Sequence, residues 1–196
     1  IKKNEKKNIF LKNLFNKIEK KKKLLIACLH PETTSSIFEN KKKFILFFKI
    51  LKKINFFIIY TYPNADTGYN EYINIINKNF RNHKNIILLK NLGIKNYYAL
   101  LNFADLMIGN SSSGIIESAS FKIPNIDIGE RQLGRFSPKN VIHAKFNLKS
   151  IHNKLKLATS KKFKKKLKHL SNPYQKKNTS NKIIKILKKY LKNRYV

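Results

Sequence analysis

The sequence predicts an α/β protein built on a doubly wound parallel sheet, in the manner of a Rossmann fold. The first observation is a set of short, continuous apolar runs, such as residues 24–29 (LLIACL), of the kind that is buried on both faces of a parallel sheet. The second is the alternation of these runs with segments of helical periodicity, joined by short loops. The third is that small and polar residues gather directly after the apolar runs, at the edge where open parallel sheets bind ligands.

The expected elements alternate from residue 24 onward. Strands are expected at residues 24–29, 56–60, 86–89, 106–108 and 124–129. Helices are expected at about residues 35–51, 69–80, 96–103, 149–170 and 179–192, with a short one after residue 114. In the first helix, the period of 3.6 residues predicts that the apolar side chains of Ile37, Phe44, Ile45 and Phe48 point inward. Residues 1–22 have helical spacing and a lysine run, which indicate a linker entering from something upstream, and residues 23–196 are expected to form the sheet domain with its C-terminal helices.

The most informative stretch is residues 105–135, DLMIGNSSSGIIESASFKIPNIDIGERQLGR. An apolar run ends at Gly109 and Asn110, three serines and a glycine follow, and helical spacing begins at Ile115, which predicts a strand, a tight loop and a helix. Small residues let the backbone approach a ligand, and the first amides of a helix point outward unpaired, which suits an anion such as phosphate. The candidate anion ligands are Ser111, Ser112, Ser113 and Gly114.

Two interpretations of this loop are open. Asn and Ser cap helices routinely, so a cap at Asn110 or Ser111 would account for the loop without any ligand. A ligand is favoured by Glu117, one turn into the helix, because its carboxylate could accept hydrogen bonds from the vicinal hydroxyls of a ribose. It is also favoured by the next expected strand, which is followed by Arg131 and Arg135, two of the four arginines in the chain.

His30 follows the first expected strand, so it is expected to face the same cleft as the three serines. A histidine with an ordinary pKa of about 6.5 suits proton transfer near neutral pH. A histidine at a strand end is also commonly structural. After the second strand, residues 61–68 (TYPNADTG) combine several turn-forming residues, which by themselves indicate only a turn.

Four motifs together resemble the hydrolysing UDP-N-acetylglucosamine 2-epimerases of the sialic and legionaminic acid pathways, which make N-acetylmannosamine-type sugars for nonulosonic acids. They are LHPETT at residues 29–34, TYPNADTG at 61–68, GNSSSGIIE at 109–117 and IGERQLGR at 128–135. The resemblance covers nearly all of residues 24–190, but only the carboxyl-terminal half of the family's length. It implies the second, UDP-binding lobe of a two-lobed glycosyltransferase-B-type fold, with the active site between the lobes.

The resemblance also implies roles for single residues. His30 matches an active-site histidine of the family, with its part in proton transfer left open. Arg131 would close on the nucleotide or its phosphates, since a guanidinium can bind two phosphate oxygens, and a structural salt bridge is the alternative. The other implied ligands are Ser111 and Ser112 for the diphosphate, Glu117 for the ribose, and Asn64 and Asp66 for the sugar side of the cleft.

The implied reaction is anti elimination of UDP across C1 and C2, giving a 2-acetamidoglucal, followed by addition of water with inversion at C2. The leaving diphosphate needs charge stabilisation, which the serine loop and Arg131 would supply, and a base must remove the C2 proton. No metal or organic cofactor is expected. The first lobe would bring further acidic groups, so this chain is expected to bind UDP but to be inactive alone, and the complete enzyme is expected to be a homo-oligomer.

The composition bounds the partners. A formal charge of +33 and an isoelectric point near 10.3 would suggest nucleic acid, but only four of the 43 basic residues are arginine. Lysine, isoleucine and asparagine share A/T-rich codons, so nucleotide bias explains the charge and a nucleic-acid partner is not expected.

No apolar run reaches about 18 residues, so no membrane span is expected. The single cysteine, Cys28, fits a reducing cytoplasm, and a chain that starts without methionine is expected to be part of a longer protein.

Some features depart from the family. Residues 172–178 (NPYQKKN) lack the Gly-Asp-Gly that the family has after Pro-Tyr, and this loss of turn-forming glycines indicates relaxed constraint or a decaying gene. A glycosyltransferase lobe of the same architecture stays open as an alternative, although TYPNADTG and GERQLGR are not expected in it. So does a non-catalytic basic module, which salt-sensitive binding to nucleic acid without affinity for UDP would favour. The motifs do not separate UDP-N-acetylglucosamine from UDP-diacetylbacillosamine as substrate.

Overall fold

The computed structural model describes residue 14, residues 23–65 and residues 68–192. In this part of the chain, six strands form one sheet in the order β3-β2-β1-β4-β5-β6, and every neighbouring pair is parallel. The strands are β1 (Leu24–Cys28), β2 (Phe57–Thr61), β3 (Ile86–Leu89), β4 (Leu106–Gly109), β5 (Asn125–Ile128) and β6 (Val141–Ala144). The predicted doubly wound parallel sheet is confirmed.

The direction in which the chain winds reverses at β1. β1 pairs with β2 on one side and with β4 on the other, so the chain first moves outward through β2 and β3. It then returns across the sheet and continues outward through β4, β5 and β6. The crevice at the carboxyl ends of β1 and β4 is therefore the topological switch point, where open parallel sheets bind their ligands.

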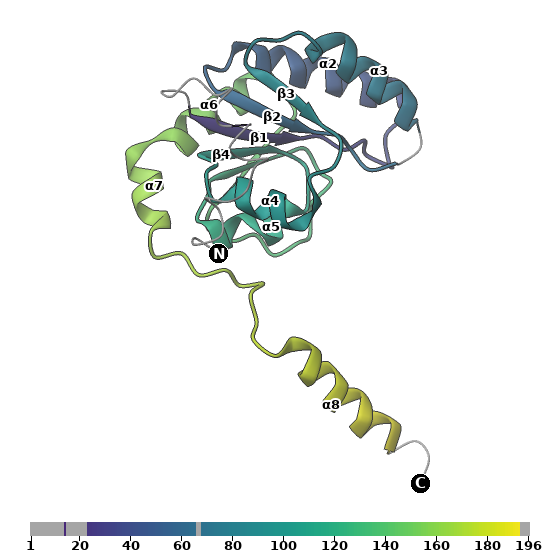
Figure 1. The fold of residues 1–196 in the computed structure, drawn as a ribbon, viewed down its shortest axis with the longest axis vertical. Helices are drawn as coiled ribbons and strands as arrows, with labels where there is room; N and C mark the ends of the chain where they lie inside the picture. Colours follow the sequence, from purple (N-terminus) through teal and green to yellow (C-terminus); the bar gives the residue numbers. More distant parts are fainter. Residues whose placement is uncertain (1–13, 15–22, 66–67, 193–196) are drawn as a thin grey trace.

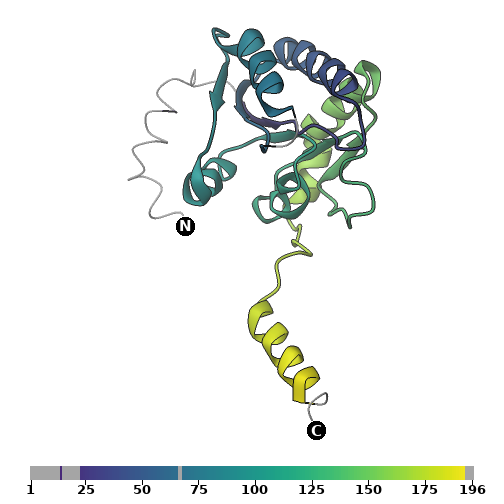
Figure 2. The same ribbon diagram turned by 90° about the vertical axis from the view of Figure 1, so that its right-hand side faces the viewer.

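Helices cover both faces of this sheet (Figures 1 and 2). The helices are α2 (Ile37–Lys53), α3 (Tyr69–Phe80), α4 (Gly93–Leu101), α5 (Ser113–Ile116), α6 (Leu148–Thr159), α7 (Lys161–Leu167) and α8 (Thr179–Lys192), with a 3-10 turn, η2, at Ser118–Phe121. The core side chains of α2, α3 and α6 share one cluster with Leu25 and Ala27 of β1. Those of α4 share the opposite cluster with Leu24 and Ile26, as the two-residue period of a strand requires.

The first helix buries a different set of residues from the one expected: Asn40, Phe44, Phe47, Phe48, Ile50 and Leu51. Phe44 and Phe48 are fully buried, and Phe48 packs edge-on against Phe80 with ring centroids 4.5 Å apart. The prediction that Ile37 and Ile45 also point inward is wrong, because each is 42% exposed. The aromatic rings already fill the space between α2, α3 and the sheet, so the two isoleucines lie at the margin of the helix face.

Two local features differ from the expected pattern. Strand β6 was not predicted, because it is an edge strand of four residues in which the exposed His143 interrupts the apolar run. The single helix expected at 149–170 is two helices, since the backbone of Ser160 is extended (φ −66°, ψ 141°). The Ser160 side chain accepts a hydrogen bond from the amide of Phe163 at 3.2 Å, so this serine ends α6 and caps α7.

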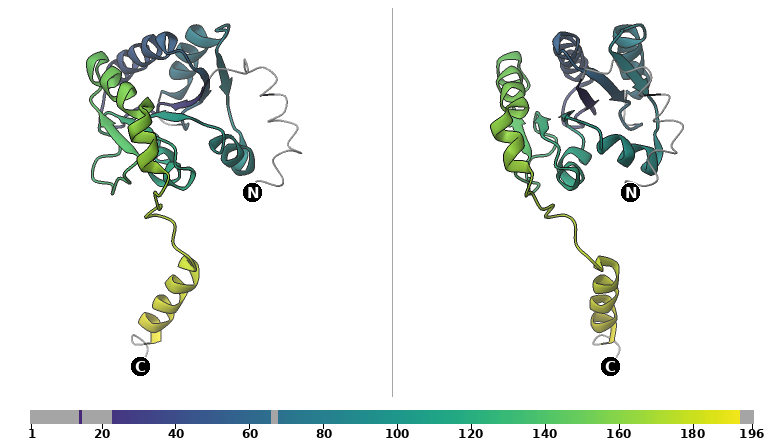
Figure 3. Two further views of the ribbon diagram at one scale, coloured as in Figure 1. Left: turned by 90° about the vertical axis from the view of Figure 1, so that its left-hand side faces the viewer. Right: turned by 60° about the vertical axis from the view of Figure 1, so that its left-hand side comes forward.

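The ends of the chain differ in how they meet the sheet domain. Of the segment expected to be a linker, only Leu14 lies within the described residues, and it is helical and buried in the core cluster of α4. At the other end, α8 stands clear of the sheet domain beyond an extended segment (Figures 1 and 3). Among the described helices, none is long and apolar enough to cross a bilayer.

Candidate functional site

A pocket of about 470 Å³ opens at the switch point. We call it the switch-point pocket; it is lined by Cys28, His30, Thr61, Tyr62, Asn64, Lys90, Asn91, Leu92, Gly93, Ile94, Tyr97, Ser111 and Ser113. The lining comes from the loops after β1, β2, β3 and β4, because parallel strands deliver all their carboxyl ends to one edge. Four of the predicted site residues, His30, Asn64, Ser111 and Ser113, therefore meet in one cavity.

Asn110 connects the loops at this edge of the sheet through hydrogen bonds. Its side-chain oxygen accepts a hydrogen bond from the backbone amide of His30 at 2.7 Å, and its side-chain nitrogen donates to the carbonyl of the same residue at 2.9 Å. Its own carbonyl accepts hydrogen bonds from Gln132 at 2.8 Å and from Arg131 at 3.2 Å. Asn110 is thus not a helix cap. Its 1% exposed side chain connects the loops after β1 and β4, and its backbone carbonyl connects them to the loop after β5.

The hydrogen bonds around His30 assign its tautomer. The backbone amide of Asn64 donates to Nδ1 of His30 at 3.2 Å, so this nitrogen carries no proton in the neutral ring. The ring proton is then on Nε2, which lies 3.2 Å from the sulfur of Cys28, and His30 is one of the residues that line the switch-point pocket. In the neutral ring, Nε2 of His30 is therefore a hydrogen-bond donor.

Cys28 forms part of the floor of the pocket. Burial raises the pKa of its thiol to about 11, an effect that hydrogen bonds to Thr61 and Ser111 and the charge of Arg131 only partly oppose. The thiol is therefore uncharged at neutral pH, and the sulfur is a neutral neighbour of the His30 imidazole.

The serine loop is held by its own backbone. The amides of Gly114 and Ile115 donate to the carbonyls of Ser111 and Ser112, both at 3.0 Å. The expectation that the first amides of the helix are free is thus wrong for these two residues, and α5 is only one turn long. Among the described residues, the amides of Ser112 and Ser113 have no acceptor, so anion binding would fall to these amides and to the hydroxyls.

Gly114 has a packing role in the structure. A Cβ atom added at this position would lie 2.5 Å from the side-chain nitrogen of Asn125, so the glycine lets α5 lie directly on β5. Ser118, one turn further, donates from Oγ to the carbonyl of Gly114 at 2.6 Å. These contacts fix the height of the serine loop above the sheet edge.

Glu117 is linked to the pocket through Ser113. Oγ of Ser113 donates to Oε2 of Glu117 at 2.6 Å, and the hydroxyl of Tyr98 donates more weakly to Oε1 at 3.4 Å. Because the Ser113 proton is committed to the carboxylate, the hydroxyl of Tyr97, 2.6 Å away, is the donor to Ser113. The sequence did not predict a role for Tyr97, because its place three and four positions before the buried Leu100 and Leu101 indicates only the core face of a helix.

The structure separates Arg131 from the pocket that holds His30. Its side chain is exposed and lines a neighbouring hollow of about 310 Å³ with Glu32, Thr33, Thr34, Glu130 and Leu133. It is nevertheless joined to the same edge through Asn110. Ser112, Gly114 and Glu117 do not line the switch-point pocket either, and Asp66 lies outside the described residues.

A pair of ionisable groups, the buried Asp127 and the exposed His143, lies on β5 and β6. Asp127 is 2% exposed, and its Oδ2 accepts a hydrogen bond from Nδ1 of His143 at 2.9 Å. Burial raises the pKa of the Asp127 carboxyl above its ordinary value, against the lowering effect of His143 and of Arg131. The far nitrogen of His143 lies 2.9 Å from Oγ of Ser137.

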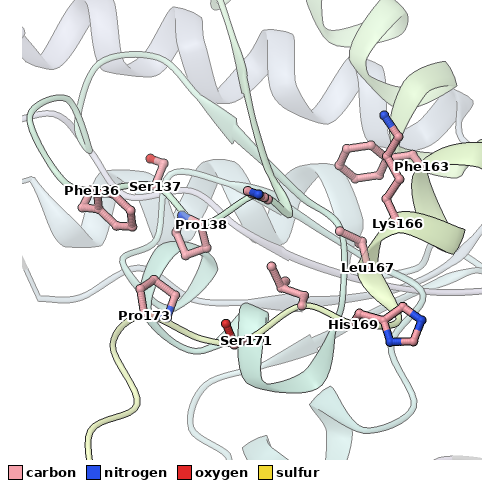
Figure 4. Close-up of a pocket in the computed structure, with 11 residues that line it drawn as sticks. Phe136, Ser137, Pro138, Phe163, Lys166, Leu167, His169, Ser171 and Pro173 are labelled. Atoms are coloured by element: carbon pink, nitrogen blue, oxygen red, sulfur yellow. The ribbon is translucent and has the colours of Figure 1, made fainter.

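A further hollow of about 460 Å³, which we call the α7 hollow, lies away from the predicted site (Figure 4). Phe163, Lys166 and Leu167 of α7 form one side, and Phe136, Ser137, Pro138 and Pro173 form the other. The segment that lacks the family's Gly-Asp-Gly borders this hollow and is pinned at two points. The Tyr174 hydroxyl donates to the carbonyl of Phe136 at 2.6 Å, and the Asn172 side chain donates to that of Ile116 at 2.8 Å.

Comparison with known proteins gives a consistent family. A model of the UDP-N-acetylglucosamine 2-epimerase family matches residues 2–188. Polysialic acid biosynthesis protein P7 of Escherichia coli is 31% identical over 88% of this chain and 44% of its own length. GDP/UDP-N,N'-diacetylbacillosamine 2-epimerase (hydrolyzing) of Campylobacter jejuni is 40% identical over 64% of this chain and 33% of its own length. The chain thus spans less than half the length of these curated relatives.

A solved structure shares the fold. The UDP-GlcNAc 2-epimerase from Neisseria meningitidis, bound to UDP-GlcNAc, superposes with a TM-score of 0.69 at 16% identity, covering 93% of this chain and 50% of that one. The sheet order and helix layers of this chain are therefore those of one half of that protein. The match of residues 2–188 covers most of the chain, and so the chain belongs to the UDP-N-acetylglucosamine 2-epimerase family.

Proposed function

We propose that this chain is the UDP-binding half of a hydrolysing UDP-sugar 2-epimerase. The observation that carries the proposal is that His30, whose Nε2 bears the ring proton, and Ser111 line one pocket at the sheet's switch point. A hydrolysing type is supported by the Campylobacter jejuni relative, whose name includes that activity. Residues 1–22 would link this domain, residues 23–196, to an upstream half that completes the active site.

The diphosphate would bind above the serine loop. The hydroxyls of Ser111 and Ser112 and the amides of Ser112 and Ser113 are the donors at this edge of the sheet. The guanidinium of Arg131, held through Asn110, would close on the phosphates from the loop after β5. These groups would stabilise the charge that develops on the diphosphate as it leaves.

His30 would assist the elimination step as a hydrogen-bond donor. When the C1–O bond breaks, its electron pair goes to the diphosphate, and His30, which lines the same pocket, would donate a hydrogen bond from Nε2–H to that oxygen. The C2 proton passes to a base, the C1–C2 double bond forms, and water then adds to give an N-acetylmannosamine-type sugar for nonulosonic acid synthesis. We assign the base to the upstream half, because the chain's own acid near the serine loop, Glu117, is committed to Ser113.

Calorimetric titration of the chain with UDP tests the proposal. We expect Arg131→Ala to weaken the Kd for UDP by about tenfold, as the loss of a charged hydrogen bond predicts, and Ser111→Ala to weaken it by about threefold. Arg135→Ala is the matched control, because it removes the same charge from the same exposed loop and should change the Kd by less than about twofold. Equal UDP binding by all four proteins would contradict the proposal.

A further inference from the structure

The hydroxyl groups of Tyr97 and Ser113 and the carboxylate of Glu117 form one directed chain of hydrogen bonds, which we call the hydrogen-bond chain. The Tyr97 hydroxyl lies 2.6 Å from Oγ of Ser113, which in turn lies 2.6 Å from Oε2 of Glu117. Since a carboxylate only accepts, Ser113 donates to Glu117 and Tyr97 donates to Ser113. Each proton of the hydrogen-bond chain therefore points in the same direction, from α4 through the serine loop to the end of α5.

The first member of the chain is rigidly placed. Tyr97 comes from the middle of α4, whose neighbouring Leu100 and Leu101 are fully buried against the sheet. Burial raises the pKa of the Tyr97 hydroxyl far above its ordinary value, so the group stays protonated and keeps its role as donor. Its ring also lines the switch-point pocket beside His30 and Ser111.

The last member of the chain is the group expected to receive the ribose. A carboxylate accepts from two vicinal hydroxyls only if its plane is fixed relative to the sugar. Ser113 occupies one acceptor position on Oε2, which leaves Glu117 with a defined orientation and with free acceptor positions on both oxygens. Without the bond from Tyr97, the Ser113 hydroxyl could rotate, and the carboxylate would lose this constraint.

We propose that Tyr97 is a positioning residue, which fixes Glu117 through Ser113 and so gives the site its preference for ribonucleotides over 2′-deoxyribonucleotides. The inference rests on the proposed function, because it needs a uridine nucleotide bound at the switch point. It goes further by assigning a source of sugar discrimination to a residue that does not itself contact the ribose.

The test compares the Kd values of UDP and 2′-deoxy-UDP in the same chain. Wild type should bind UDP about tenfold more tightly, since the deoxy sugar leaves a carboxylate position unpaired. Tyr97→Phe keeps the ring and removes only the hydroxyl, and it should reduce the ratio to about threefold or less by weakening UDP alone. Ser113→Ala should have the same effect, and the double variant should lose no more than either single one, because both break one chain.

Tyr174→Phe is the control. It also removes a tyrosine hydroxyl with a 2.6 Å hydrogen bond, but that bond is made to the carbonyl of Phe136 at the α7 hollow. Tyr174→Phe should therefore leave the ratio of the two Kd values unchanged. If Tyr97→Phe weakens both nucleotides equally, or changes neither, or if wild type binds both alike, Tyr97 does not set sugar preference and the inference fails while UDP binding stands. If wild type binds no UDP, the proposed function fails and the inference falls with it.

Discussion

Asn110 and His30 are joined by two reciprocal hydrogen bonds, although 80 positions separate them in the sequence. The side-chain amide of Asn110 both donates to and accepts from the backbone of His30, at 2.9 Å and 2.7 Å. The hydrogen bonds fix the His30 peptide to the end of β4, from which the serine loop begins. The relative height of His30 and the serines is thus set by one amide side chain.

Asn110→Asp should therefore damage both stability and binding. The change replaces a donor by a carboxylate oxygen that faces the carbonyl of His30, in a position that is 1% exposed. We expect a loss of about 2–4 kcal/mol in the free energy of unfolding, measured with urea. Asn147→Asp is the control, because the exposed Asn147 only accepts a hydrogen bond, from the amide of Ser150, and aspartate accepts equally well. Similar losses in the two variants would show that the Asn110 amide donor is unimportant.

The end of β4 requires a glycine. Gly109 has φ +142°, and a Cβ atom there would lie 1.7 Å from the carbonyl oxygen of Cys28. We expect Gly109→Ala to cost at least about 3 kcal/mol of unfolding free energy, since neither the backbone nor the strand can move away. Gly134→Ala, at φ +80° with open space around it, should cost only about 1 kcal/mol. Equal midpoints of urea unfolding for the two variants would refute this explanation.

The thiol of Cys28 should be unreactive in the folded chain. With its pKa raised to about 11, the thiolate fraction at pH 8 is about a hundredth of that of an ordinary cysteine. Iodoacetamide labelling, followed by mass spectrometry, should therefore be about a hundredfold slower in the native chain than in urea, and should accelerate about tenfold per pH unit below pH 11. Because Cys28 is the only cysteine in the chain, the mass increase reports this site alone. Equal rates in both states would contradict a desolvated, protonated thiol.

Asp127 should make stability depend on pH in a particular direction. Burial raises its folded pKa, so the proton is bound more tightly in the native state, and the stability that this provides is lost as the pH rises through that pKa. Asp127→Asn keeps an acceptor for Nδ1 of His143 and carries no charge. At pH 7.5 the variant should gain on the order of 1 kcal/mol relative to wild type, and the gain should shrink at pH 4. A gain that grows on acidification would show that His143 and Arg131 outweigh burial.

The sequence was sufficient for those features that repeat locally. Continuous apolar runs predicted β1 to β4, because a strand buried on both faces is mainly apolar. Strand β5 was also predicted, although it carries the buried polar residues Asn125 and Asp127. The same rule failed for β6, where His143 of an edge strand turns outward and pairs with Asp127. The break at Ser160 was missed because a serine within helical spacing gives no sign of whether its side chain will cap the next turn.

The candidate site was predictable in position but not in its connections. The switch point and the serine loop follow from strand order, and His30, Asn64 and two serines do meet there. The contacts of Asn110 and Tyr97 depend on residues 80 and 16 positions away, respectively, which no local pattern reveals. Arg131 was expected at the anion site itself, whereas the structure places it in the adjoining hollow.

Because α8 stands clear of the sheet domain, its hydrogen bonds are expected to open more often than those of the sheet. Ile183, Ile184, Leu187 and Tyr190 are each about half exposed, and the 14-residue helix stands away from the sheet. A helix of this length that stands clear of the sheet domain opens and closes readily in water, whereas β1 and β4 open only with the whole domain. In deuterated solvent, the amides of α8 would therefore exchange orders of magnitude sooner than those of the central strands, and global unfolding probes would not detect its opening.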